Sequence, residues 1–217
     1  MMHRLALVLV AFCQAGPAMA QRLSVHGTIG RASSDMNWEA GNGEVSSANQ
    51  TRESVYAAVG VRRRVARWFS LATDVQLVGK GYDRTAPTLH ATFIEVPLLL
   101  LWEGSGPARR TQPYLGGGLA PGVRLRCRRF FIGNIGPHED GCGAARYSAL
   151  ALEPYRRWDV SQEWRAGVRR ALGAGRLVAG LRASASLTDQ QPGRESRNVS
   201  THHFVLGWGL GYELPVR

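Results

Sequence analysis

Large apolar side chains alternate with small or polar ones along much of this chain, most clearly over residues 201–214. Large apolar residues occupy every second position from Phe204 to Leu214, and glycine or glutamate fills most of the gaps. A period of two is typical of a β-strand, because successive side chains leave opposite faces of the backbone. One face of this predicted strand is therefore bulky and partly aromatic, while the other is nearly bare.

Seven further segments alternate in the same way, which gives eight predicted strands of about 11 to 15 residues. They cover residues 22–32, 53–65, 69–82, 88–102, 112–125, 158–170, 176–187 and 201–214. Soluble strands usually have about five or six residues, whereas a tilted strand needs about 9 to 11 to cross the hydrocarbon core of a membrane. In a small membrane barrel the apolar face meets lipid and the small or polar face lines the lumen. The sequence therefore predicts an all-β fold, an eight-stranded antiparallel up-and-down transmembrane β-barrel.

The connections between these segments also alternate in length. Long or intermediate ones follow the first, fifth and seventh segments, over residues 33–52, 126–157 and 188–199. Most of the others, including residues 83–87 after the third segment, are short. Because bacterial outer-membrane barrels have short periplasmic turns and longer external loops, we expect both chain ends on the periplasmic side. A soluble, lipocalin-like barrel with inverted faces is the alternative fold, since it would alternate similarly.

Residues 1–20 have the pattern of a secretory signal peptide. His3 and Arg4 precede a short apolar run, and Ala18 and Ala20 are small residues at the cleavage positions. The run is too short for a membrane-spanning helix, which needs about 20 apolar residues. We expect a signal peptide over residues 1–20 and one outer-membrane barrel domain over residues 21–217. Cleavage would remove Arg4 and no acid, so the formal net charge would change from +11 to +10.

Several short motifs connect the chain with a known family. They are Gly60-Val-Arg, Phe69-Ser-Leu and the segments 77–82, 94–100 and 113–118. Through them the chain resembles the porin-like or OmpA-like family of eight-stranded outer-membrane β-barrel proteins. Residues 209–214 also resemble the signal by which the barrel-assembly machinery recognises its substrates. The resemblance implies a bacterial outer-membrane location, with membrane lipid and the barrel-assembly machinery as partners.

The faces predicted to point inward carry charged residues of both signs. These are Arg62, Asp74, Lys80, Glu95, Glu163, Arg165, Arg182 and Glu213, with His26 on the same face. About eight strands leave a lumen wide enough only for side chains, and a buried charge is costly unless it is paired. We therefore predict an internal network of ion pairs that plugs the lumen. The function this favours is a structural or surface-interaction scaffold, and a narrow pore of low conductance is the alternative.

A lipid A-modifying barrel enzyme is a second, weaker alternative. Such enzymes need a serine, a histidine and an acid close together, and one group of residues offers these types near the start of the last segment. The group consists of Glu195, Ser196, Ser200, His202 and His203. No nucleophile motif accompanies it, so we expect no catalytic residue and no enzyme.

Cys127 and Cys142 are the two cysteines that remain after signal cleavage. An exported chain can oxidise such a pair, so we predict a disulfide that closes part of the connection 126–157. A metal site that also uses His138, Glu139 and Asp140 is the alternative, but the spacing matches no standard zinc pattern. We expect no metal and no cofactor.

Arginine accounts for almost all of the positive charge, and Lys80 is the sole lysine. Four arginines cluster where the fifth segment enters the longest connection: Arg124, Arg126, Arg128 and Arg129. Guanidinium groups bind phosphate through paired hydrogen bonds, so contact with lipopolysaccharide phosphates is one interpretation. A solvated, self-repelling loop base is the other. Nucleic acid is not an expected partner, because an exported protein rarely meets it.

Overall fold

The computed structural model describes residues 23–40, 45–47, 51–83, 88–104, 110–133, 136–140, 142, 155–190 and 199–216. Their regular elements are strands of one antiparallel sheet. The strands are β1 (Leu23–Ala40), β2 (Val45–Ser47), β3 (Arg52–Arg64), β4 (Phe69–Tyr82), β5 (Thr88–Glu95), β6 (Leu98–Glu103), β7 (Thr111–Gly133), β8 (Gly136–Asp140), β9 (Trp158–Leu172), β10 (Gly175–Ser186) and β11 (Val199–Pro215). Within these ranges no helix is long and apolar enough to cross a membrane. The predicted signal peptide lies outside the described residues.

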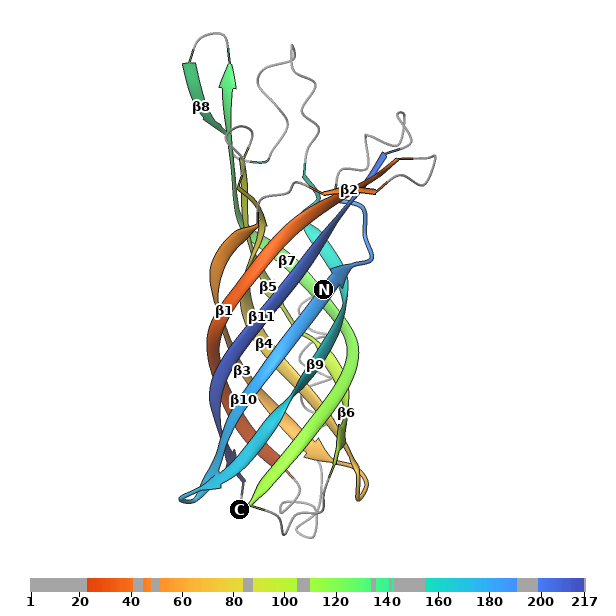
Figure 1. Cartoon of the computed structure of the whole chain (residues 1–217), viewed down its shortest axis with the longest axis vertical. Coiled ribbons are helices and arrows are strands. Elements are labelled where there is room, and N and C mark those ends of the chain that lie inside the picture. The colour runs from red at the N-terminus through yellow and green to blue at the C-terminus, as the bar shows by residue number, and fades with distance from the viewer. Residues whose placement is uncertain are drawn as a thin grey trace, which may run out of the picture.

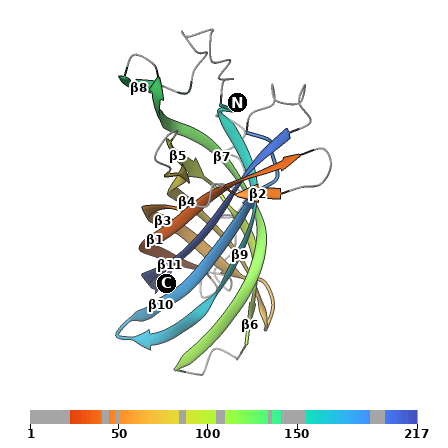
Figure 2. The same cartoon turned by 45° about the horizontal axis from the view of Figure 1, so that its top comes forward.

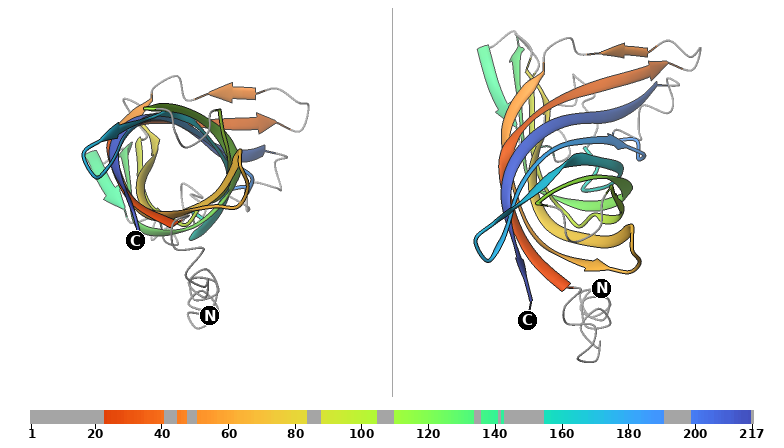
Figure 3. Two further views of the ribbon diagram at one scale, coloured as in Figure 1. Left: turned by 90° about the horizontal axis from the view of Figure 1, so that it is seen from below. Right: turned by 60° about the horizontal axis from the view of Figure 1, so that its bottom comes forward.

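The sheet closes on itself into a barrel (Figure 1), because β11 pairs with both β10 and β1. The pairing of β1 with β11 runs from Ser24–Pro215 to Ala40–Val199. Seen along its axis, the barrel is a ring of strands (Figure 3). The prediction of a closed, eight-stranded, all-antiparallel barrel is confirmed.

β5 and β6 together form one strand of the barrel, with a break at Val96 and Pro97. Both pair with β4 on one side and with β7 on the other. Proline has no backbone N–H to give to a neighbouring strand, and the ladder resumes at Leu98. Val96 still donates a hydrogen bond of 2.9 Å to the carbonyl oxygen of Pro121. The predicted segment 88–102 is therefore a single barrel strand with a local interruption.

Two strands are longer than the alternation predicts. β1 continues to Ala40 and β7 to Gly133, into stretches read from the sequence as connections. Their extensions pair with the short strands β2 and β8, which lie beyond the ring at the end with the long connections (Figure 2). The extensions thus carry antiparallel structure past the barrel wall.

The two ends of the barrel differ. At one end, which we call the short-turn end, residues 65–68 join β3 to β4 and residues 173–174 join β9 to β10. Gly173 has a φ of 58°, a conformation that favours glycine in such a tight turn. β1 begins and β11 ends at this same end (Figure 1). The longer connections leave from the opposite end, as the sequence predicts.

The outer wall of the barrel is apolar. Ile29 and Val55 are 63% and 65% exposed, whereas the neighbouring Tyr56, which points inward, is 7% exposed. Leucine, valine and tryptophan side chains on the other strands are exposed in the same way. This arrangement is the reverse of a soluble barrel, which buries its apolar side chains. The lipocalin-like alternative is therefore inconsistent with the structure.

Candidate functional site: the barrel lumen

Charged side chains fill the lumen in three layers, stacked along the barrel axis from the short-turn end. The basal layer contains Arg62, Arg64, Arg169, Glu103 and Glu213. The middle layer contains Asp74, Glu163, Arg165 and Arg182. The upper layer contains Lys80, Glu95 and Asp159. Most of these side chains are buried, so their charges have to be compensated by partners inside the lumen.

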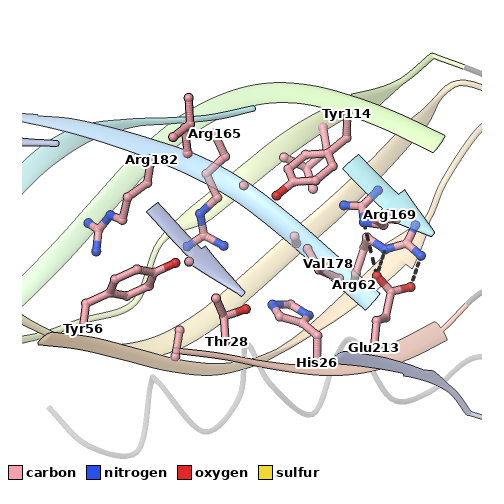
Figure 4. A pocket seen from close by; sticks show the side chains of 16 residues that line it. His26, Thr28, Tyr56, Arg62, Tyr114, Arg165, Arg169, Val178, Arg182 and Glu213 are labelled. Carbon is pink, nitrogen blue, oxygen red and sulfur yellow. Dashed lines mark hydrogen bonds and ion pairs between the residues drawn. The ribbon is translucent and has the colours of Figure 1, made fainter. Parts of the chain in front are cut away.

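In the basal layer, Arg62 is the central group (Figure 4). Its guanidinium on β3 forms an ion pair with Glu213 on β11, which Figure 4 shows. It forms a second ion pair with Glu103 on β6. Arg169 on β9 lies 3.3 Å from each of these two carboxylates. Arg64 lies 2.5 Å from Glu103. Because the partners come from strands that are not neighbours in the sheet, the layer spans the lumen.

The middle layer is built around Arg165 on β9. Its guanidinium pairs with Asp74 on β4, and its Nε lies 2.7 Å from Glu163. Arg182 on β10 lies 3.1 Å from Glu163 through Nη2. Gln76 donates hydrogen bonds of 2.8 Å to Glu163 and 2.9 Å to Glu95, which links this layer to the upper one.

The upper layer is centred on Lys80, whose side chain has no exposed surface. Its Nζ lies 2.6 Å from Glu95 and 2.5 Å from Asp159. The other carboxylate oxygen of Asp159 accepts hydrogen bonds of 2.5 Å from Ser186 and 2.6 Å from Thr188. A lysine without water around it is stable only with such partners. Both acids therefore hold its charge in the lumen.

An apolar layer covers the upper layer on the side of the long connections. It contains Met36, Val78, Leu89, Phe93, Cys142 and Tyr155, all buried. Cys142 forms a disulfide with Cys127 on β7, with 5.5 Å between the Cα atoms. The backbone N–H of Tyr155 donates a hydrogen bond of 3.3 Å to the carbonyl oxygen of Cys142. The disulfide thus ties Cys142 to the barrel wall.

A cavity of about 40 Å³ remains between the basal and middle layers. Its lining includes His26, Tyr56, Tyr114 and four arginines, Arg62, Arg165, Arg169 and Arg182 (Figure 4). A polar cavity needs about 10 to 15 Å³ for one water molecule, so this one has room for a few waters. It has no room for a hydrated ion with its full shell.

Glycines in the wall make room for the two tyrosines. A Cβ atom at Gly180 would lie 2.3 Å from the hydroxyl oxygen of Tyr114, and one at Gly209 would lie 2.5 Å from that of Tyr56. Both distances are shorter than any real carbon–oxygen contact. The bare face in the sequence of β11 therefore leaves space for the side chain of Tyr56, which comes from β3, the next strand but one.

The eight residues predicted for the lumen network all point inward, and each lies within ion-pair distance of a residue of opposite charge. The prediction omitted Arg64, Glu103, Asp159 and Arg169, which complete the basal and upper layers. The alternation in the sequence contained the information needed to find two of them. Glu103 falls on the same face of its strand as Glu95, and Asp159 falls on the same face as Glu163.

The four arginines proposed for phosphate do not form one cluster. The ladder between β5 and β7 shifts register after Thr92, where Leu125 has no partner. Arg126 and Arg128 consequently lie exposed on the outer face, whereas Arg129 is 5% exposed. Arg124 is half-buried and donates a hydrogen bond of 2.5 Å to the carbonyl oxygen of Tyr155. Of the four, the bulge leaves Arg126 and Arg128 accessible to a phosphate group.

The residues of the enzyme alternative are not brought together as a described set. His203 is 1% exposed and points into the lumen, where its ring lies 5.6 Å from that of Tyr155. The Nδ1 of His202 lies 3.2 Å from the carbonyl oxygen of Ser186. Glu195 and Ser196 lie outside the described residues. Among the side chains that are described, no group of His, Cys, Asp or Glu has the arrangement of a metal site.

Neither a protein-family model nor a curated protein sequence matches the chain. Solved structures of bacterial outer-membrane proteins do. Neisserial surface protein A has a TM-score of 0.50 at 11% identity, over 89% of this chain and 96% of that protein. OprG from Pseudomonas aeruginosa has a TM-score of 0.47 at 13% identity, over 89% and 97%. Ail from Yersinia pestis, solved with a heparin analogue, has a TM-score of 0.42 at 12% identity, over 88% and 99%.

Identities this low bear on the fold alone. The similarity to Neisserial surface protein A extends over nearly all of both chains. It agrees with the closed ring of antiparallel strands. The chain has the fold of the eight-stranded outer-membrane β-barrel proteins.

Proposed function

We propose that this protein resides in the bacterial outer membrane and is a non-conducting, non-enzymatic scaffold. Its barrel would anchor the long connections at the cell surface, and its lumen would be closed by paired charges. The exposed apolar wall supports the membrane location, since a wall of this kind needs lipid as its solvent. The resemblance of residues 209–214 to a barrel-assembly signal supports insertion by the barrel-assembly machinery.

The closed stack of ion pairs carries the proposal. An ion that crossed the lumen would have to separate pairs in all three layers, such as Lys80 with Asp159 and Arg62 with Glu213. Breaking one buried pair costs about 3 to 5 kcal/mol. The apolar layer at the far end adds a further barrier. A lumen closed in this way favours a structural role, in which the ion pairs stabilise the barrel wall, over the passage of solutes.

The extended strands support a role at the cell surface. β1 and β7 continue past the ring and carry β2 and β8 with them (Figure 2). With the short-turn end in the periplasm, these extensions would stand above the membrane. Arg126 and Arg128, exposed on β7, would then be placed to bind lipopolysaccharide phosphates.

Two measurements test this function. Fractionation of cell envelopes should place the protein with the outer membrane. In planar bilayers, the purified full chain should show no steady single-channel current, while Glu95→Ala should conduct or unfold more easily, because it removes a partner of Lys80. A steady current through the wild type, unaltered by Glu95→Ala, would refute the plug and favour the narrow pore.

A further inference from the structure

The outer surface of the short-turn end carries arginines and, among the described residues, no acid. Arg67, Arg110 and Arg170 are exposed there, and we call these three the basic rim. The acids described at this end, Glu103 and Glu213, are both buried in the basal layer. Among the residues described at this end, no exposed acid therefore lies beside the positive charge of the rim.

The basic rim follows consecutive strands around the barrel. Arg110 and Arg170 are neighbours, since the carbonyl oxygen of Arg110 accepts a hydrogen bond of 2.7 Å from Ala171 and Arg170 pairs with Thr111. Arg67 lies in the turn before β4, which pairs with β6. The rim therefore extends from the turn between β3 and β4 to β9.

Exposed aromatic side chains near the basic rim indicate its depth in the membrane. Phe69 and Trp102 face each other across β4 and β6 and are 41% and 45% exposed. The guanidinium of Arg67 lies 5.0 Å from the ring of Trp68. Half-exposed aromatic rings in membrane barrels lie at the level of the lipid headgroups. The basic rim, just beyond these rings, would therefore lie among headgroup phosphates.

The opposite end has no such bias. Arg126, Arg128 and Arg157 are exposed there, but Glu53 is exposed as well, and Asp83 and Asp189 are partly exposed. Arg31 lies 3.6 Å from Glu53. The charge on the outer surface is therefore mixed at one end of the barrel and uniformly positive at the other.

We propose that the basic rim binds the headgroups of anionic phospholipids, in the membrane leaflet that surrounds the short-turn end. A guanidinium group offers paired N–H donors to phosphate oxygens, and basic residues beside an anionic membrane surface attract its lipids. The proposal rests on the membrane location given above. It adds a selectivity for lipid charge that the fold does not require.

Spin-label electron paramagnetic resonance on the full chain in phosphatidylcholine vesicles tests the proposal. Trace spin-labelled phosphatidylglycerol should associate with the wild type about fivefold more strongly than spin-labelled phosphatidylcholine, the preference expected for about one effective arginine contact. The variant R67Q/R110Q/R170Q should lower this ratio towards one. High salt should lower the wild-type ratio too, because salt screens exposed charges.

The control is R31Q/R157Q, which removes two exposed arginines from the opposite end, neither of them assigned to phosphate binding. It should keep most of the selectivity. Equal losses in the rim variant and in this control, or no loss in the rim variant, would overturn the proposal. Failure of the wild type to insert into vesicles would refute the membrane location as well, whereas insertion without lipid selection would refute the basic-rim proposal alone.

Discussion

The ammonium group of Lys80 on β4 lies 2.5 Å from the carboxylate of Asp159 on β9, although β5 and β7 stand between these strands in the sheet. The pair therefore crosses the lumen. Since both side chains are buried, the contact joins opposite parts of the wall in a place that water does not reach freely.

Replacing Lys80 by methionine should destabilise the barrel strongly. Asp159 would lose the cation it pairs with and Glu95 would keep only Arg182, at 3.4 Å, so the buried negative charge would be poorly compensated, at a cost of about 3 to 5 kcal/mol. The free energy of unfolding, measured by tryptophan fluorescence against denaturant in vesicles, reports the loss. Arg31→Ala is the control, because its exposed pair with Glu53 should contribute less than about 1 kcal/mol. A small effect at Lys80 would mean that the upper layer does not brace the wall.

The two faces of β11 should respond oppositely to a spin label. Leu206 is 52% exposed on the outer wall, whereas Gly207 faces the lumen, near Arg182. A label at position 206 should collide with lipid-soluble oxygen, and one at position 207 should not. Arginine at Leu206 or Leu210 should cost about 2 to 4 kcal/mol near the midplane of the membrane. A lipid-accessible label at position 207 would contradict the assignment of the faces.

Cys127 and Cys142 should be bonded in protein taken from the native envelope. Mass spectrometry without reduction should find both cysteines in one disulfide. In the chain-entropy model a closed loop of this size is worth about 3 kcal/mol. Reduction should therefore lower the free energy of unfolding, and Cys127→Ala/Cys142→Ala should be insensitive to reductant. Free thiols in the native material would refute the pairing.

Gly209→Ala should destabilise the barrel by about 1 to 3 kcal/mol, because the new methyl group would overlap the hydroxyl of Tyr56 and approach the backbone of β1. Combining it with Tyr56→Phe should restore part of the loss, since the hydroxyl is then absent. Gly27→Ala is the matched control on a neighbouring strand, as a Cβ there meets no atom within 4 Å. Equal unfolding free energies for both alanine variants would contradict the packing described for Gly209.

Much of the fold could be predicted because alternation is a local property. β4 has the predicted bounds, and the predicted inward residues all face the lumen. The alternation of inward and outward side chains continues unchanged across the break at Pro97, since Glu95 and Leu101 both point into the lumen. Continuing this alternation by one more inward position beyond Leu101 would have placed Glu103 in the lumen.

The bulge in β7 could not be predicted in the same way. It depends on how β7 pairs with β5, which lies in a different part of the sequence, and it reverses the faces beyond Leu125. A strict period of two consequently places Arg126, Arg128 and Arg129 on the wrong faces relative to Arg124 and the earlier part of the strand. The lengths of β1 and β7 have a similar origin, because their extensions depend on pairing with β2 and β8.

The pairing of β1 with β11 sets the order in which this barrel can be completed. β1 pairs with β3 and with β11, so one of its edges stays unpaired until β11 is in place. A folding intermediate without β11 therefore has two open sheet edges with unpaired backbone groups. Such edges are hazardous in an aqueous compartment and intolerable in hydrocarbon. Removal of β11 should therefore yield an aggregation-prone sheet instead of a smaller barrel, and closure has to coincide with entry into the membrane.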